Sequence, residues 1–220
     1  MKEVKLIEIS EDIKADNRAE AEQVRKLLAE SETHMVNLMS SPGAGKTSLV
    51  LKTAALLKEY VRIAVVEADM DSQVDTETLL TAGVSAVQLR TGGFCHVDAY
   101  MMRKTLSELQ LDDTDLLILE NVGNLICPAQ SDTGAHTNVM ILSVPEGDDK
   151  PLKYPLMFRQ SDALVVNKTD YLQMGGFDMS ELRRRVVNLN PGMPIFEVSC
   201  KTGEGIADWA EWLLQRIQGR

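Results

Sequence analysis

Short apolar runs alternate with helical patterns along most of this chain. Runs rich in Val, Ile and Leu predict strands at residues 35–39, 63–67, 86–89, 116–119, 139–143, 163–167 and 195–198. Their nearly continuous apolar content is typical of strands that are buried on both faces, as in a parallel sheet. Between these strands, the pattern predicts helices at 46–60, 97–109, 180–189 and 206–217.

A longer helical pattern precedes the first of these strands. Residues 10–31 predict one helix, with Ser10 as its N-cap and Val24, Leu27 and Leu28 among its apolar positions. The alternation that follows favours a layered α/β fold with right-handed crossovers. The pattern predicts the sheet but does not predict the order of its strands.

Composition and charge limit the classes of function. Apolar residues make up 44% and charged residues 25% of the 220 residues, a balance typical of globular proteins. The net charge of −10, from 33 acidic and 23 basic residues, argues against general binding to nucleic acid. A local pocket of backbone amides and one lysine can still bind a nucleotide.

The chain carries no sequence signal for a membrane or for export. No apolar run approaches the roughly 20 residues that a bilayer requires, so we expect no membrane association. Residues 1–12 mix acidic and basic side chains, unlike a secretory signal. The three cysteines are too few for a disulfide scaffold, which favours a reducing, cytoplasmic location.

The strongest motif follows the first predicted strand and opens the next helix. Residues 40–47 read Ser-Ser-Pro-Gly-Ala-Gly-Lys-Thr and are followed by Ser48. Phosphate binding needs inward-facing backbone N–H groups, which the flexible Gly43 and Gly45 allow around Ala44. Lys46 can reach the β- and γ-phosphates, and the Thr47 hydroxyl can bind Mg²⁺.

One position departs from this phosphate-binding motif. Ser40 stands where the general P-loop has its first glycine, and a glycine-rich turn without a ligand is the alternative interpretation. The Gly-Lys-Thr ending and the strand–helix context favour the P-loop. We therefore predict a three-layer P-loop NTPase fold, with a mainly parallel sheet of about seven strands and an N-terminal helix. Its expected parts are a helical extension at 1–33 and a nucleotide-binding G domain at 34–220.

A second motif points to guanine. Asn167, Lys168 and Asp170 follow a buried strand in an Asn-Lys-Thr-Asp run. Guanine presents N1–H and N2–H₂ donors together, and one carboxylate, that of Asp170, can accept both. Asn167 can hold the loop and the Lys168 stem can cover the base. Further contacts can come from the next loop, at Ser199, Cys200 and Lys201. Alone, such a run is a common surface turn, but its position after a P-loop favours a GTP/GDP site.

Acidic residues cluster after predicted strands. Glu67, Asp69, Asp71, Asp75 and Glu120 lie at or beyond the ends of two of them. Carboxyl ends of parallel strands face the ligand crevice, where Mg²⁺ needs oxygen ligands. Capping of helices is the alternative for each residue. The residues selected for catalysis are Lys46, Asp69, Asp75 and Glu120, and those for Mg²⁺ are Thr47, Asp69, Asp75 and Glu120. Arg62, Arg90, Arg103 and Arg159 are equal candidates for an arginine that contacts phosphate.

The chain resembles the hydrogenase nickel-incorporation GTPases, the HypB family of the SIMIBI class, from about residue 30 onward. The resemblance rests on residues 40–47, on Thr-Gly-Gly-Phe-Cys-His-Val-Asp-Ala at 91–99, on Glu-Asn-Val-Gly-Asn-Leu-Ile-Cys-Pro at 120–128, on Glu-Gly-Asp-Asp-Lys-Pro at 146–151 and on 167–170. It implies a slow GTPase that dimerises in its GTP state. The implied partners are the hydrogenase large subunit and companion maturation proteins, and the implied process is nickel insertion into [NiFe]-hydrogenase.

The same resemblance assigns a metal site to Cys95, His96 and Cys127. Thiolate and imidazole suit Ni²⁺ or Zn²⁺, and two chains can share one ion. Without the resemblance, such a set of side chains is more often an incidental cluster. The chain departs from many members of the family because its histidines are limited to His34, His96 and His136, so an N-terminal nickel store is not expected. The segment 69–79 also looks looser than the family's switch, and Ala135 replaces an acidic residue.

Several alternatives stay open at this point. One is a P-loop ATPase or small-molecule kinase, against which Asp170 argues. Others are a GTPase that delivers metal to urease or serves a cobalamin enzyme, and a metal-storage protein with vestigial hydrolysis. Pro128 is followed by Ala129, which speaks against the Cys-Pro-His segment expected of the urease branch. GTP and Mg²⁺ are expected to order the segments 69–75 and 120–124, so that the nucleotide state alters the metal site at Cys127.

Overall fold

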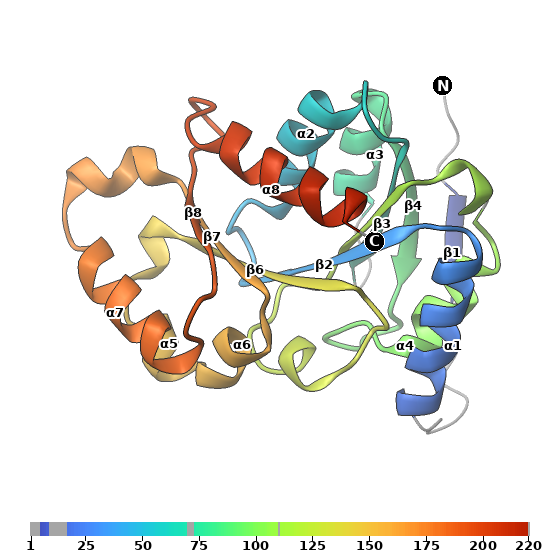
Figure 1. The fold of residues 1–220 in the computed structure, drawn as a ribbon, viewed down its shortest axis with the longest axis horizontal. Helices are drawn as coiled ribbons and strands as arrows, with labels where there is room; N and C mark the ends of the chain where they lie inside the picture. Colours follow the sequence, from blue (N-terminus) through green and yellow to red (C-terminus); the bar gives the residue numbers. More distant parts are fainter. Residues whose placement is uncertain (1–4, 9–16, 70–72, 110, 220) are drawn as a thin grey trace.

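A single parallel sheet organises the molecule (Figure 1). The computed structural model describes residues 5–8, 17–69, 73–109 and 111–219. Within them, the strands are β1 Lys5–Glu8, β2 His34–Ser40, β3 Ile63–Asp69, β4 Ser85–Arg90, β5 Leu116–Glu120, β6 Thr137–Ser143, β7 Ala163–Asn167 and β8 Ile195–Glu197. Their order is β1-β4-β3-β5-β2-β6-β7-β8, and every pair is parallel.

The helices cover both faces of this sheet (Figure 1). They are α1 Asn17–Glu30, α2 Lys46–Leu57, α3 Val74–Thr81, α4 Ala99–Leu106, α5 Lys150–Lys153, α6 Pro155–Gln160, α7 Met179–Leu189 and α8 Ile206–Gln218. Short 3₁₀ helices are η1 Leu111–Asp113, η2 Pro128–Gln130, η3 Val144–Glu146 and η4 Thr169–Met174. Helices α2, α3 and α8 pack on one face, and α1, α4, α6 and α7 pack on the other.

Alternate residues of the strands supply the hydrophobic clusters on the two faces of the sheet. In β2, Val36 and Leu38 pack with Leu49 and Trp209 on the face covered by α2 and α8. Met35, one position away, packs on the opposite face. All residues of β2, β5 and β7 are buried. Burial on both faces explains why these strands read as continuous apolar runs, and it confirms the predicted parallel sheet.

Some predicted elements differ from the observed ones. All seven predicted strands are present, but residues 5–8, for which no strand was predicted, form β1. Helices α3, α5 and α6 were not predicted either, because α5 and α6 are short and α3 contains three threonines and little apolar periodicity. Helix 46–60 ends earlier, at Leu57, and helix 97–109 is shortened to Ala99–Leu106. The described part of helix 10–31 starts at Asn17, and Ser10 lies outside the described residues.

The first helix packs directly on the sheet domain. Its buried residues Ala21, Val24 and Leu28 share a core with β5 and α4. Figure 1 shows α1 beside α4 at one end of the sheet. The division of the chain at residue 33 remains a prediction.

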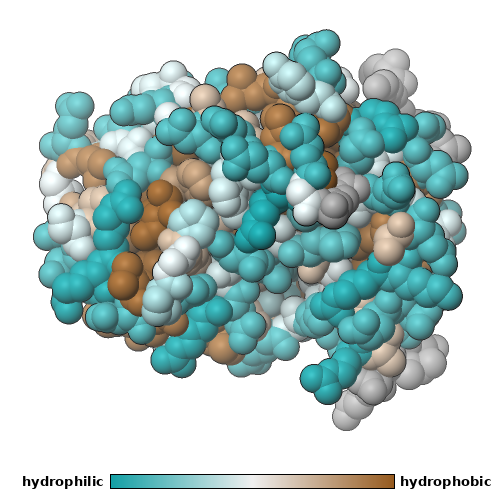
Figure 2. All heavy atoms as spheres, viewed as in Figure 1, coloured by the Kyte–Doolittle hydropathy of each residue, from teal (hydrophilic) through white to brown (hydrophobic). Residues whose placement is uncertain are grey.

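The outer surface is mostly polar. Figure 2 shows a largely hydrophilic face with hydrophobic patches near α2 and near β8. Within the described ranges, none of the helices combines the length and the apolar character needed to cross a bilayer.

Candidate functional site

The phosphate loop joins β2 to α2 in the predicted way. Gly43 and Gly45 have φ values of 75° and 99°, in the left-handed region that favours glycine. The Lys46 Nζ donates to Ser40 Oγ at 3.2 Å, and Ser40 Oγ donates to the Ser41 carbonyl at 2.7 Å. The serine at the motif's first position therefore orients the lysine that is expected to meet phosphate.

The predicted base loop is attached to the phosphate loop by side chains. Asn167 Nδ2 donates to the Ala44 carbonyl at 2.9 Å, and Lys168 Nζ donates to the Gly43 carbonyl at 2.8 Å. Asn167 Oδ1 accepts from the backbone N–H groups of Lys168 at 2.7 Å and Cys200 at 3.2 Å. The three loops after β2, β7 and β8 thus form one cradle.

Asp170 is oriented at the far end of this cradle. Ser199 Oγ donates to Asp170 Oδ1 at 2.7 Å, and Lys201 Nζ lies 3.7 Å from Asp170 Oδ2. The Asp170 side chain retains 15% of its exposed surface, so the carboxylate remains accessible. Cys200 contributes its backbone N–H to Asn167, and burial raises the pKa of its thiol to about 11. That thiol is therefore a packing group.

Two buried carboxyl groups lie beneath the phosphate loop. Glu67 on β3 and Glu120 on β5 are register neighbours, and each is 3% exposed. Thr47 Oγ1 donates to Glu120 Oε1 at 2.8 Å, while Thr76 Oγ1 donates to Glu67 Oε2 at 3.2 Å. Glu120 Oε2 is buried and has no hydrogen-bond partner among the described residues. An unpaired buried oxygen beside a threonine hydroxyl fits a Mg²⁺ site.

Burial shifts both carboxyl groups towards their neutral forms. Desolvation, followed by repulsion from Glu120, raises the pKa of Glu67 to about 8. Desolvation raises the pKa of Glu120 to about 7, although Lys46 and Thr47 favour its charged form. The charge of Asp75 raises the pKa of both Glu67 and Glu120. Asp75, a predicted Mg²⁺ and catalytic residue, therefore lies near these two carboxyl groups. Asp69 acts on Glu67, whereas Asp71 lies outside the described residues.

The structure also brings the three predicted metal ligands together. Donor atoms of Cys95, His96 and Cys127 all lie within 4.8 Å of one another, and Cys95 Sγ is 3.9 Å from His96 Nδ1. Cys95 is exposed after β4, and Cys127 immediately precedes η2. A hydrogen bond with Cys127 raises the pKa of Cys95, and burial lowers the pKa of His96. A neutral imidazole is the form that binds metal.

One segment connects the metal cluster to the phosphate loop. A Cβ atom added to Gly123 would lie 2.9 Å from Pro42 N and Cγ, so the backbone of this segment lies directly against the phosphate loop. Asn124 Nδ2 donates to the Cys95 carbonyl at 3.3 Å. Asn124 ends the segment 120–124 that GTP and Mg²⁺ were expected to order, but the sequence predicted no contact for its side chain. Its position between Glu120 and Cys127, which are both predicted site residues, is the signal that could have identified this contact.

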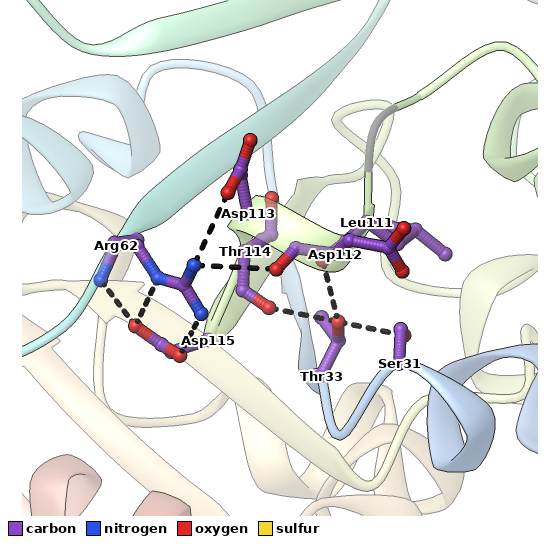
Figure 3. Close-up of polar contacts among 8 residues, drawn as sticks. All are labelled: Ser31, Thr33, Arg62, Leu111, Asp112, Asp113, Thr114 and Asp115. Carbon is purple, nitrogen blue, oxygen red and sulfur yellow. Dashed lines mark hydrogen bonds and ion pairs between the residues drawn. The ribbon is translucent and has the colours of Figure 1, made fainter.

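Two of the candidate arginines are engaged elsewhere. Arg62 directly precedes β3, at the edge of the sheet opposite to the strand ends that form the cradle. Figure 3 shows its guanidinium bonded to Asp115, Asp113 and the Asp112 carbonyl. Arg103 on α4 pairs with Glu20 on α1. Neither arginine is placed to contact phosphate in this cradle.

The chain is similar to known proteins over most of its length. The family model for the CobW/HypB/UreG nucleotide-binding domain matches residues 34–197. Hydrogenase maturation factor HypB of Azotobacter chroococcum is 41% identical over 95% of this chain and 68% of its own length. Hydrogenase/urease maturation factor HypB of Helicobacter hepaticus is 40% identical over 96% of this chain and 88% of its own length.

A solved structure agrees with this sequence match. The crystal structure of HypB from Helicobacter pylori in complex with nickel has a TM-score of 0.88 and 37% identity. It covers 93% of this chain and 96% of the solved chain. With the family model, the relatives and the solved fold in agreement, this chain belongs to the CobW/HypB/UreG family, in its HypB branch.

Proposed function

We propose that this protein binds and slowly hydrolyses GTP, and that the GTP cycle controls delivery of nickel during maturation of a [NiFe]-hydrogenase. The observation that carries this proposal is the segment from Glu120 to Cys127. Its first residue bonds Thr47 of the phosphate loop, and its last belongs to the metal cluster. The names of the relatives, and the nickel complex of the Helicobacter pylori protein, support the choice of hydrogenase and nickel.

Guanine is the base that the cradle is best suited to accept. The buried Ser199 and the exposed Lys201 both contact the Asp170 carboxylate, which keeps 15% of its surface exposed for a base edge. A charged acceptor for two adjacent N–H donors discriminates guanine from adenine. Asn167 and Lys168 hold the phosphate loop at a fixed distance from this group.

Magnesium is the expected companion of the nucleotide. The Thr47 hydroxyl and the unpaired Glu120 oxygen would hold it, with Asp69 and Asp75 as the further carboxylates at this site. When bound, Mg²⁺ neutralises charge on the phosphates. Lys46 adds a second positive charge, and the same carboxylates can orient the attacking water. We expect intrinsic turnover on the order of 10⁻⁴–10⁻² s⁻¹, as in switch GTPases without an activator.

The metal ion is cargo in this proposal. Two thiols and one imidazole suit Ni²⁺ in a planar site or Zn²⁺ in a tetrahedral site. Three protein ligands leave one position for a donor from another molecule. Segment 120–127 couples this cluster to the nucleotide, and such coupling is typically about 1–3 kcal/mol, or about 5–150-fold in affinity.

A second copy of the chain is proposed to cover the cluster in the GTP state. Phe94 and Ile126 stand next to two of the ligands and are 39% and 55% exposed. Exposed apolar side chains beside an incomplete metal site favour a protein surface that becomes buried on assembly. Further partners in the proposal are the hydrogenase large subunit and companion maturation proteins.

Equilibrium dialysis of Ni²⁺ and Zn²⁺ tests the proposal directly. The protein is dialysed with GDP and then with a non-hydrolysable GTP analogue. We expect binding near one ion per two chains, with an affinity that differs between the nucleotides. Cys127→Ala should abolish this binding, and Cys200→Ala should leave it unchanged because Cys200 belongs to the base loop. Equal metal affinity in both nucleotide states would contradict the proposal that the nucleotide controls metal binding.

Urease is the second candidate client. The Helicobacter hepaticus relative is named a hydrogenase/urease maturation factor, which favours this alternative. Reconstitution with purified apo-enzymes separates the two clients. Nickel transfer that activates only urease would replace hydrogenase in the proposal without changing the GTP-dependent step.

A further inference from the structure

The first turns of α1 contact the two chain segments that carry the metal ligands. Asn17 Oδ1 accepts a hydrogen bond from the Ala99 N–H at 2.9 Å, and Asn17 Nδ2 donates to the Asp132 carbonyl at 2.9 Å. Ala99 begins α4 shortly after His96, and Asp132 follows Cys127 and η2. The amide of one side chain therefore joins the two segments.

These bonds differ from an ordinary helix cap. An asparagine at a helix N-terminus commonly accepts from the free N–H groups of its own helix. Here the acceptor oxygen takes the first N–H of a different helix, α4. At α4, the preceding Asp98 provides the usual cap by accepting from the Met101 N–H at 2.8 Å. Asn17 is thus placed as a link between segments.

Ion pairs and packing strengthen the same link. Arg25 binds both carboxylate oxygens of Asp132, at 2.7 and 2.9 Å, and Asp132 Oδ1 also accepts from the Gly134 N–H at 2.8 Å. A Cβ atom added to Gly134, which has φ +81°, would lie 2.5 Å from Val24 Cγ1. The loop after Cys127 is therefore pressed against α1. Arg103 of α4 pairs with Glu20 of α1.

The ligand segments are also held on their inner side. Asn121 Oδ1 accepts from the Val97 N–H at 3.0 Å, and Asn124 Nδ2 donates to the Cys95 carbonyl at 3.3 Å. The stretch from Cys95 to Ala99 is therefore held from within by the Glu120–Cys127 segment and from outside by Asn17. Removing one of these supports leaves the spacing between the ligand segments less restricted.

We infer that Asn17 is a positioning residue for the Cys95/His96/Cys127 site. It sets the spacing of the two ligand-bearing segments without contacting the metal. The inference rests on the proposed function, because it requires the cluster to bind metal. Loss of a hydrogen bond to a metal ligand typically lowers metal affinity about 10- to 100-fold, and because Asn17 bonds residues beyond the ligands we expect an effect at the lower end of this range.

Titration with Co²⁺ tests the inference, because its absorption bands report both affinity and coordination geometry. Asn17→Ala should bind Co²⁺ about 10-fold more weakly and show altered d–d bands at saturation. The matched control is Lys26→Ala, on the exposed face of α1, where Lys26 makes a long, exposed pair with Glu30 at 3.9 Å and no other ion pair with the described residues. Lys26→Ala should match the unmodified protein in both respects. Binding of a fluorescent GDP analogue checks that each variant is folded.

A second variant keeps the test decisive if Asn17→Ala is unstable. Asn17→Asp retains the acceptor for the Ala99 N–H but loses the donor to the Asp132 carbonyl, so we expect an intermediate affinity and altered bands. Unchanged affinity and bands in a folded Asn17 variant would overturn the inference. Absence of Co²⁺ binding to the unmodified protein would instead overturn the proposed metal site, so the two failures are distinguishable.

Discussion

The nucleotide cradle and the metal cluster lie at the same edge of the sheet, but they are supported differently. The cradle consists of strand ends whose side chains bond directly to neighbouring backbone, as Asn167 and Lys168 do with Ala44 and Gly43. The cluster lies on loops, and Cys95 is exposed. These loops are held by residues that are not themselves candidate ligands, such as Asn124, which bonds the Cys95 carbonyl. A site that must bind one ligand reproducibly benefits from rigid support, whereas a site that must release its cargo benefits from support that can change.

The largest expected effect concerns the rigid region. Asp170→Asn replaces a carboxylate acceptor with an amide, so guanine loses two charge-assisted hydrogen bonds. Each such bond is worth about 1.5–3 kcal/mol, and we expect GTP affinity to fall at least about 100-fold. Xanthosine triphosphate, which carries a carbonyl in place of the amino group, should bind the variant better than GTP does. Nucleotide competition measures both effects.

The metal cluster provides the control for this comparison. Ni²⁺ affinity in the nucleotide-free Asp170→Asn protein should match that of the unmodified protein. A parallel loss of metal binding would contradict the separation of the two regions.

A pH effect of a few kcal/mol is expected from the carboxyl pair beneath the cradle. Burial raises the pKa of Glu67 from its usual 4.5 to about 8 and that of Glu120 to about 7, so the folded state retains protons that the unfolded state loses. In the protein without nucleotide and Mg²⁺, the carboxyl pair therefore makes its most favourable contribution to the free energy of unfolding below about pH 4.5. This contribution should fall by several kcal/mol as the pH rises towards 8, because each unit of pKa shift corresponds to about 1.4 kcal/mol.

Denaturant titrations across this pH range measure the effect. Glu67→Gln keeps an acceptor for the Thr76 hydroxyl and should flatten the profile. Glu59→Gln, at an exposed position just beyond α2, is the matched control and should leave the profile unchanged. An unaltered slope in Glu67→Gln would show that the buried pair does not retain protons.

A pair of glycine variants isolates the contact between the base loop and the phosphate loop. Gly45 and Gly43 both have positive φ, but an added Cβ meets Asn167 Nδ2 at 2.4 Å only at Gly45. Both substitutions carry backbone strain of about 1–3 kcal/mol. Gly45→Ala should therefore unfold at a lower temperature than Gly43→Ala when both lack nucleotide. Equal melting temperatures would mean that Asn167 moves aside without cost.

The smallest expected effect concerns the coupling between the two regions. Gly123 lies against Pro42 without positive φ, so Gly123→Ala adds a clash and no backbone strain. The clash should push the segment 120–127 away from the phosphate loop. The ratio of the Ni²⁺ affinities in the GDP and GTP-analogue states should therefore fall by about 5-fold, which is near the lower limit of allosteric coupling. Dialysis with both nucleotides measures this ratio. A ratio equal to that of the unmodified protein would mean that coupling runs through another contact.

The sequence predicted the elements of the sheet better than it predicted the helices between them. Strands buried on both faces leave continuous apolar runs, so β2 to β8 were identified close to their observed bounds. The helix α3 was missed because it has little apolar periodicity, and β1 was missed because four residues give a weak pattern. The candidate metal ligands were named by resemblance, because Cys95 and Cys127 lie on separate loops, and their binding of metal stays a prediction.

The sequence by itself determined which candidate groups the chain carries: a glycine-rich loop between a strand and a helix, the carboxylate proposed for guanine, and the thiol and imidazole groups proposed for a metal ion. These depend on residue type at fixed local spacing, which the sequence states directly. Only the tertiary structure decided which groups meet. The register of β3 with β5 pairs Glu67 with Glu120, and the docking of α1 brings Asn17 to the loops beside the metal cluster. Such contacts join residues far apart in the chain, so no local pattern encodes them.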